Sequence, residues 1–380
     1  MGTIIKYGVW VITLLLFTSC IEPYRPELDK TQSEYILVVE GLISNEPGSF
    51  RISLSRSVPV DTTLSYLPES GAYVYISDDL GNLYEFYEDA PGDYKSIDEN
   101  ARAYSDRKYQ LFITDSQGND YESSLVQMEP TPDIKRVYWN EETKDVFSEN
   151  EVHKEKGINI FVESEEGSKD TGESKYYKWD FTETWKLEMP DYVTVIRMFG
   201  PPVQVLVNLP PEKQHCWVTW PSENILLKSL AGQETEKVDS LLVMQIPEKG
   251  QRLHYRYSIE VRQYCLDQEM YNFWNSIKEF NEDIGSMYDH MPYAVFGNIT
   301  CCNDDNVSVL GYFDAAEIKK KRIFIDQYDH QLPTRNVYED CVYSFSPNDN
   351  PFASGVYAIS SFCADCRHYG TSVKPDFWDE

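Results

Sequence analysis

The sequence predicts a mainly β protein, in which an N-terminal immunoglobulin-like sandwich is followed by a larger β-rich domain with one packed helix. Composition supports this fold class, because the chain contains 28 Tyr and 8 Trp, and aromatic residues favour the pleated, half-buried surface of a sheet. Short runs of alternating apolar and polar residues, separated by turn residues, also recur along most of the chain. Such alternation is typical of strands with one buried face.

The first 19 residues have the features of a signal peptide. Lys6 supplies a positive charge, and the apolar run at 7–17 is too short to cross a bilayer. Thr18 and Ser19 then lead to Cys20, as small residues do in the bacterial lipobox. We therefore expect residues 20–33 to be a lipidated cysteine and a polar spacer, so that Cys20 tethers the body to a membrane. An ordinary cleaved signal with an incidental cysteine is the alternative.

Residues 34–128 are expected to form the immunoglobulin-like sandwich. An apolar run at 35–43 is closed by the turn at Pro47 and Gly48, and alternation resumes at 50–54. Similar short patterns continue as far as Tyr121. About seven strands, with turn signals at intervals of roughly 8–12 residues, are typical of this sandwich.

Residues 129–380 are expected to form the second, β-rich domain, beginning where Pro130 and Pro132 interrupt a strand. Its strands include an aromatic alternation at 177–182 and a longer one at 253–265. Residues 267–285 read as a helix with Asp267 as its N-cap. Its apolar stripe, with Phe273 and Trp274, is expected to be buried against the sheet that contains 253–265.

The chain is strongly acidic, with a formal net charge of −29 at pH 7. Removal of Lys6 with the signal peptide makes the mature body one unit more negative. A body of this charge repels nucleic acid and anionic lipid head groups, so nucleic acid is not an expected partner.

Eight cysteines are present, and an odd seven remain once Cys20 is lipidated. An envelope compartment permits disulfides, and the polar C-terminal region contains Cys341, Cys363 and Cys366. We expect Cys341 to bond to one of the other two, although connectivity cannot be deduced from sequence. A zinc site formed by these three cysteines and His368 is the alternative.

Two tryptophans, Trp185 and Trp220, are candidates for contact with a ligand, since exposed rings can stack on sugar faces. The alternative is that they belong to the core. Thr62 and Ser240 follow aspartate in short motifs that resemble O-glycosylation acceptors, in regions predicted to be loops.

No motif for catalysis, a metal or a cofactor is recognised. The six histidines lack the spacing of a zinc or nucleophile motif, and no G-x-S-x-G or glycine-rich phosphate loop occurs. Oxygen-rich turns around Gly81 and Gly118 could hold calcium, but Asx-rich hairpin turns have the same composition. We therefore assign no catalytic residue, no metal and no cofactor.

Several motifs together resemble an uncharacterised family of Bacteroidota outer-membrane lipoproteins known as domain of unknown function 4249 (DUF4249). They are Val39-Glu40-Gly41-Leu42-Ile43, Tyr109 to Ile113, Arg256 to Gln263, Tyr271 to Trp274, Gly297-Asn298-Ile299, Val309 to Phe313, Lys321 to Ile325, Cys363 to Arg367 and Pro375 to Trp378. Such proteins are typically encoded beside TonB-dependent receptors. The resemblance implies an outer-membrane location and a receptor partner, and it supplies no catalytic residues.

These observations lead to an expected function. The chain is expected to be an accessory or binding lipoprotein of a TonB-dependent transport system, anchored in the outer membrane by its lipid, with a glycan or a peptide as cargo. The receptor association favours the cell-surface side over the periplasmic side. An envelope glycan-directed hydrolase and a surface structural or adhesive protein are the alternatives.

Overall fold

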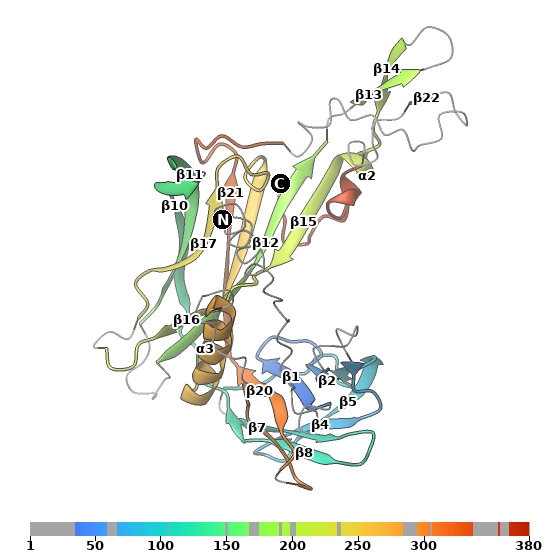
Figure 1. Cartoon of the computed structure of the whole chain (residues 1–380), viewed down its shortest axis with the longest axis vertical. Coiled ribbons are helices and arrows are strands. Elements are labelled where there is room, and N and C mark those ends of the chain that lie inside the picture. Colours follow the sequence, from blue (N-terminus) through green and yellow to red (C-terminus); the bar gives the residue numbers. More distant parts are fainter. Residues whose placement is uncertain are drawn as a thin grey trace, which may run out of the picture.

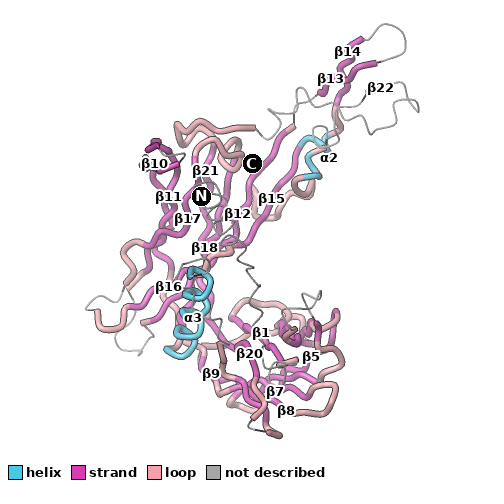
Figure 2. Tube along the Cα trace, viewed as in Figure 1, coloured by secondary structure: helices cyan, strands magenta, loops and turns pink. Residues whose placement is uncertain are grey.

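The computed structural model shows two β lobes with a helix, α3, between them (Figures 1 and 2). It describes residues 35–58, 67–105, 107–148, 151–166, 175–189, 192–197, 203–233, 237–283, 295–304, 306–336, 356–357 and 365–379. The mainly β class and the packed helix are confirmed.

The first lobe contains strands from two distant parts of the chain. They are β1 (Leu37–Ser44), β2 (Arg51–Arg56), β3 (Leu67–Pro68), β4 (Tyr73–Asp78), β5 (Leu83–Ala90), β6 (Asp93–Ser96), β7 (Lys108–Thr114), β8 (Asp120–Ser123), β9 (Val126–Gln127), β19 (Ile299–Cys301) and β20 (Val309–Ala316). β20 pairs in parallel with β1, and β19 pairs with β8. The lobe therefore includes residues 299–316, which the predicted range 34–128 omits.

The sheet of the first lobe follows one path, β19-β8-β7-β4-β5-β6-β2-β1-β20. Its two ends approach each other at the bridge between Phe296 and Leu310. The sheet thus wraps around one core, in which Val39, Leu54 and Leu111 are fully buried. An immunoglobulin-like topology is not confirmed, because the strands from the far end of the chain complete this path.

The second lobe places a three-stranded sheet and a five-stranded sheet around a second core. The three-stranded sheet consists of β10 (Ile134–Ser148), β11 (Glu151–Ser164) and β17 (Leu241–Pro247). The five-stranded sheet consists of β12 (Tyr176–Glu188), β15 (His215–Pro221), β16 (Leu226–Ser229), β18 (Arg256–Leu266) and β21 (Ile318–Asp326). The predicted aromatic alternation is confirmed in β12, where Tyr177, Trp179 and Phe181 are buried. β18 begins three residues later than the predicted 253–265.

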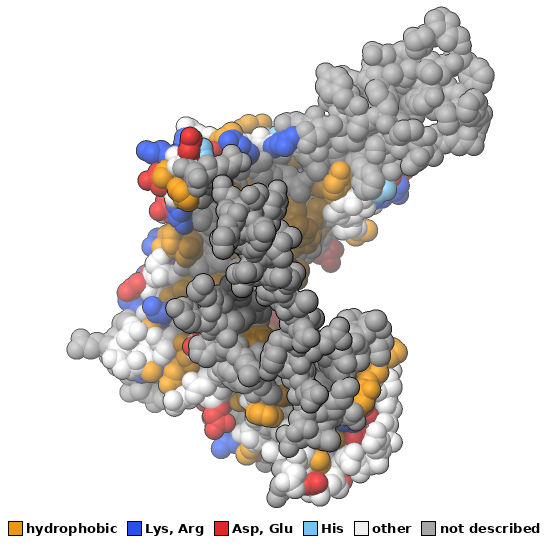
Figure 3. Space-filling view, viewed as in Figure 1, with side chains coloured by type: hydrophobic (Ala, Val, Ile, Leu, Met, Phe, Trp, Pro, Cys, Tyr) orange, Lys and Arg blue, Asp and Glu red, His pale blue; other side chains and the backbone are white. Residues whose placement is uncertain are grey.

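The hairpin of β10 and β11 extends beyond the rest of its sheet. β17 pairs with β11 only over Gly157–Val162, whereas the hairpin itself continues to the Ser148–Glu151 pair. Figure 3 shows acidic, basic and apolar side chains mixed over this region, at the upper left of the view. Phe147 and Val152 are exposed there.

A smaller three-stranded sheet lies apart from both lobes, beyond the α2 end of β15 (Figure 1). It contains β13 (Tyr192–Arg197), β14 (Val203–Asn208) and β22 (Val356–Tyr357). The short helix α2 (Pro211–Gln214) leads into β15, and the single-turn helix η3 (Cys366–His368) precedes the C-terminal tail.

Two of the chain's three crossings between the lobes adjoin each other. β9 is followed by the proline-rich segment 130–132, and β20 continues into β21 through Glu317 alone. Thr131 joins the two crossings, because its backbone N–H donates to the Glu317 carboxylate at 2.8 Å and its hydroxyl donates to the Glu317 carbonyl at 2.7 Å. Asn45 of the first lobe also accepts a hydrogen bond from the N–H of Ile318 at 2.8 Å. The lobes therefore meet at a hydrogen-bonded junction.

Candidate functional site

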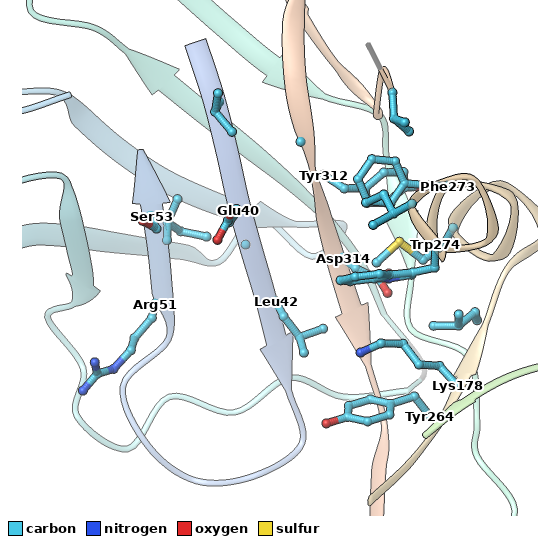
Figure 4. Close-up of a pocket in the computed structure, with 18 of the residues that line it drawn as sticks. Glu40, Leu42, Arg51, Ser53, Lys178, Tyr264, Phe273, Trp274, Tyr312 and Asp314 are labelled. Carbon is cyan, nitrogen blue, oxygen red and sulfur yellow. The ribbon is translucent and has the colours of Figure 1, made fainter. Parts of the chain in front are cut away.

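A cleft of about 820 Å³ lies between the first lobe and α3 (Gln268–Asp283). Its floor is the outward face of β6, β2, β1 and β20, one wall is α3, and residues of β12 and β18 close one end. Figure 4 shows the strands of the floor on one side and the helix with its aromatic side chains on the other. A cleft of this volume accommodates a small organic molecule or a few residues of a peptide.

Strand register arranges the floor in two rows of side chains, because residues that pair directly across a sheet share one face. One row consists of Lys95, Arg51, Leu42 and Asp314. The other consists of Asp93, Ser53, Glu40 and Tyr312. The first row thus ends near the helix in the carboxyl group of Asp314, with the apolar Leu42 before it, and the second row ends in the ring of Tyr312.

The helix forms an aromatic wall. Its N-cap is confirmed, since the carboxylate of Asp267 accepts a hydrogen bond from the N–H of Met270 at 2.7 Å. The helix packs on Tyr264 and Leu266 of β18 and on Tyr312 of β20, as expected for the sheet it covers. Phe273 and Trp274, however, are only half-buried. The expectation that both are largely buried is wrong, because the side of the helix that carries them also lines the cleft.

The closed end of the cleft contains the ammonium group of Lys178. It lies 4.5 Å from the centre of the Trp274 ring and 4.8 Å from the centre of the Tyr264 ring. Asp180 is its nearest carboxylate, at 3.8 Å. Burial lowers the pKa of Lys178, although the nearby carboxylates of Asp180 and Asp314 oppose that shift. Cation–π contact with two rings keeps a buried ammonium group in place.

Asp314 is the buried carboxyl group of the same end. It lies beneath Trp274 and near Lys178 in Figure 4, and it accepts a hydrogen bond from the N–H of Ala315 at 2.8 Å. Burial raises the pKa of Asp314 to about 7, and the negative charge of Asp267 acts in the same direction. This carboxyl group can therefore either donate or accept a hydrogen bond near neutral pH.

One hydrogen-bond donor of the cleft lacks a partner. The indole N–H of Trp274 is buried and makes no hydrogen bond within the described residues. A buried donor without a partner costs about 1–3 kcal/mol. The closed end thus combines the ammonium group of Lys178 with the titratable carboxyl of Asp314, whereas the indole N–H of Trp274 is buried out of reach of the cleft.

A second hollow, of about 620 Å³, adjoins the cleft. The two share Phe273, Val295 and Tyr312 as lining residues, and the rings of Phe273 and Tyr312 lie 5.0 Å apart between them. Several polar groups of this hollow already bond to the protein. Asn298 bonds to the backbone of Phe313, and Gln110 donates to the carbonyl of Ser123 at 2.9 Å. These groups hold β19 and β8 in place rather than facing a ligand unpaired.

The comparison with protein families shows which family the chain belongs to. The profile of the family described as "Domain of unknown function (DUF4249)" matches residues 21–322. The chain belongs to this family. The match ends in β21, so it contains both strands of the floor that come from distant parts of the chain, β1 and β20, together with α3.

Comparisons with individual proteins add little to the DUF4249 assignment. No curated protein matches the chain. Among solved structures, "Biofilm associated protein - B domain" is 9% identical, with 80% of this chain and 88% of that chain covered and a TM-score of 0.13. "Biofilm associated protein - BSP domain" is 10% identical, with 79% and 60% covered and a TM-score of 0.12. Neither likeness carries an argument about this DUF4249 member.

The candidate aromatic pair lies in the second lobe, away from the cleft residues. Trp185 is buried in the core, whereas Trp220 is 51% exposed. Their rings meet edge to face at 5.1 Å, and the guanidinium of Arg252 lies over both. The carboxylate of Glu183 accepts from Arg252 at 2.9 Å and from the Tyr257 hydroxyl at 3.1 Å. Of the two candidates, only Trp220 presents a ring to solvent.

The structure contains a disulfide that the sequence reasoning did not pair. Cys366 bonds to Cys216, with a sequence separation of 150 and a Cα–Cα distance of 5.7 Å. The proposed bond between Cys341 and Cys366 is therefore wrong. A bond between Cys341 and Cys363 stays a prediction, because both lie outside the described residues. Pairing of Trp217 with Thr371 adds the C-terminal tail to the edge of β15, next to this disulfide.

Other candidate residues have varied positions. Cys20 and Thr62 lie outside the described residues, whereas Ser240 is exposed and its hydroxyl lies 3.0 Å from that of Tyr138. The oxygen-rich turn at Asp115 closes on itself, because one carboxylate oxygen accepts from the N–H groups of Gln117 and Asn119, both at 2.9 Å.

Within the described residues, no group of three or more His, Cys, Asp or Glu is placed to hold a metal ion. None of the helices there is long and apolar enough to cross a membrane.

The cleft residues Lys178 and Asp314 were not among the sequence candidates. In a strand pattern, a charged residue such as either of these is expected to face solvent rather than a cleft.

Proposed function

We propose that this DUF4249 member is a non-catalytic, ligand-binding lipoprotein of the outer membrane that serves a TonB-dependent receptor. The cleft between the first lobe and α3 is the observation that carries the proposal. It combines an aromatic wall with a mostly buried ammonium group and a titratable carboxyl group. A concave, mainly apolar site with a few converging polar groups is the usual form of a ligand-binding site.

Binding is favoured over glycan hydrolysis by the surroundings of the carboxyl groups. A glycosidase needs two carboxyl groups, about 5–10 Å apart, on opposite sides of the sugar. Glu183, the buried carboxylate beside the Trp185–Trp220 pair, is already bonded to Arg252 and Tyr257. Asp314 lies beneath the Trp274 ring, and the ammonium group of Lys178 lies against the same ring. Because Glu183 is already bonded, it is not free to transfer a proton to a glycosidic oxygen, which supports binding rather than hydrolysis beside the tryptophan pair.

The lipid anchor is the first testable part of the proposal. Replacing Cys20 with serine is expected to abolish metabolic labelling by a radioactive fatty acid and to release the body from the membrane fraction, because serine has no thiol to accept the lipid. The matched control is Cys302→Ser, which removes an exposed free thiol of the body and is expected to keep full labelling. Labelling of the Cys20→Ser variant at the level of the control would contradict the anchor.

The receptor partnership is tested by co-purification. The tagged chain, expressed at its natural level and extracted in mild detergent after cross-linking in intact cells, is expected to enrich a TonB-dependent receptor at least tenfold over a tagged unrelated lipoprotein. Protease treatment of intact cells is expected to degrade the body, because the proposal places it on the cell surface. Recovery of the chain in good yield without any such receptor would contradict the partnership.

A further inference from the structure

We infer that pH controls the opening of the cleft, with α3 packed against the floor while Asp314 is neutral and separated from it when Asp314 is ionised. The inference concerns the regulation of the proposed ligand site, so it rests on the cleft being that site. Three features of the described residues lead to it: the burial of Asp314 where the floor meets the helix, the charges that surround it and the apolar contact between α3 and the floor.

Asp314 is enclosed at the meeting of the floor and the helix. It is only 5% exposed, and it lies beneath the Trp274 ring in Figure 4. One oxygen of its carboxyl group accepts from the N–H of Ala315 at 2.8 Å, and the other accepts no hydrogen bond from the described residues. An ionised carboxylate requires several donors or water molecules around it. The closed arrangement supplies one donor, so it favours the neutral carboxyl group.

The charged groups around Asp314 come from several elements and are mostly negative. Lys178 of β12 is a cation at this end of the cleft, but its ammonium group lies nearest to Asp180, at 3.8 Å. Burial raises the pKa of Asp314 to about 7, and the negative charges of Asp267 and Glu129 act in the same direction, whereas Lys178 opposes the shift. The other titratable groups nearby are Glu269 of α3, Tyr312 of β20, and Arg262 and Tyr264 of β18, of which the last two are bonded to Asp180.

Among the described residues, aromatic rings make the contact between α3 and the floor. The rings of Phe273 and Tyr312 lie 5.0 Å apart, and Phe273 is only half-buried. The side-chain hydrogen bonds of Asn275 and Ser276 stay within the helix. Each lobe has a core of its own, so this contact can open without the unfolding of either lobe. Opening admits water to the Asp314 carboxylate.

The difference in proton affinity between the closed and the open cleft sets the direction and the size of the effect. The pKa of Asp314 is about 7 in the closed cleft, whereas an aspartate exposed to water titrates near 4. The closed contact is therefore fully stabilised below about pH 4 and loses that stabilisation as the pH rises to 7. The ratio of open to closed molecules is expected to rise about fortyfold between pH 5 and pH 7, and only about twofold between pH 7 and pH 8.

The test is native-state thiol labelling of the detergent-solubilised full chain, with Met270→Cys as the probe. Met270 lines the cleft and is 5% exposed, so a thiol at this position reacts only when the cleft opens. Cys302→Ser removes the exposed free thiol, and mass spectrometry of peptides follows labelling by dithiodipyridine. The rate at each pH is divided by the rate of the urea-unfolded chain at that pH. We expect this ratio to rise about fortyfold from pH 5 to pH 7 and then to level off.

Two matched variants of the probe chain assign the effect to one carboxyl group. Asp314→Asn is expected to remove the pH dependence, because an amide cannot ionise. Asp93→Asn, on the exposed rim of the cleft, is expected to keep it. Ala316→Cys is a second probe if Met270→Cys does not fold, since Ala316 is fully buried, packs in the same cluster as Met270 and lies two residues from Asp314 on β20.

The buried thiols Cys301 and Cys265 report unfolding, because they lie in the cores of the first and the second lobe. Both are expected to label far more slowly than the probe. A probe rate without pH dependence, an unchanged pH dependence in Asp314→Asn, or labelling of both buried thiols at the rate of the probe would overturn the pH-controlled opening.

The opening is measured without a ligand, so its failure leaves the proposed ligand-binding function standing. Occupancy of the cleft is tested separately with Leu42→Arg, which places a charged side chain on the floor. Its control is Leu83→Arg, at a position on β5 that is 64% exposed and does not line the cleft. A cleft that opens with pH but holds no ligand would contradict the proposed function alone.

Discussion

Loss of the Cys216–Cys366 disulfide is expected to lower the free energy of unfolding by about 3–5 kcal/mol. The bond closes a loop with a sequence separation of 150 residues, and long loops restrict the unfolded chain most. It also attaches the tail that pairs with β15 through Trp217 and Thr371. The change is the double variant Cys216→Ala/Cys366→Ala, and the measurement is urea unfolding followed by circular dichroism.

Two controls make this result interpretable. Cys302→Ala removes an exposed free thiol and is expected to unfold at the wild-type urea concentration. Wild-type protein treated with a reductant is expected to lose as much stability as the double variant. Unfolding of the double variant at the wild-type urea concentration would show that the disulfide contributes no stability.

Replacing Asp314 with asparagine is expected to stabilise the fold, and the gain is expected to grow with pH. Burial raises the pKa of Asp314 to about 7, whereas an exposed aspartate in the unfolded chain titrates near 4. The stability associated with the neutral carboxyl group is therefore complete below about pH 4 and is lost as the pH rises through 7. Asparagine has a similar shape and cannot ionise.

The expected gain for Asp314→Asn is small at pH 4 and about 2–4 kcal/mol at pH 8. Lys178 opposes part of the gain, because its ammonium group favours the ionised carboxylate, whereas the carboxyl groups of Asp267 and Glu129 disfavour it. Urea unfolding at pH 4, 6 and 8 measures the difference, with Asp93→Asn on the exposed cleft rim as the control. A stability difference that does not change between pH 4 and pH 8 would contradict the assigned burial of Asp314.

The local features of the fold could be predicted from the sequence, because they depend on neighbouring residues. The alternation in β12 placed Trp179 in the core, and Asp267 was correctly expected to cap α3. The parallel pairing of β20 with β1 could not be predicted, because it joins residues more than 260 positions apart. Neither strand has a pattern that specifies its partner.

The candidate site was less predictable than the fold for the same reason. Its floor combines β1 and β20, so Asp314 and Leu42 become neighbours only through the long-range pairing. The partner of Cys366 was also missed, since pairing depends on the meeting of β15 with the C-terminal tail. Trp185 lies on β12 and Trp220 lies on its neighbour β15. They differ in burial because β15 ends near Trp220, at the rim of the core.

The most direct test of the ligand-binding function is native mass spectrometry of the chain purified gently from its own cells. We predict that the wild type carries an additional bound mass, which dissociates on collisional activation, and that Leu42→Arg lacks it while Leu83→Arg retains it. Leu42 is decisive because it lies at the apolar middle of the cleft floor. A wild type without any bound mass, or a bound mass that Leu42→Arg retains unchanged, would contradict the assignment of this cleft as the ligand site.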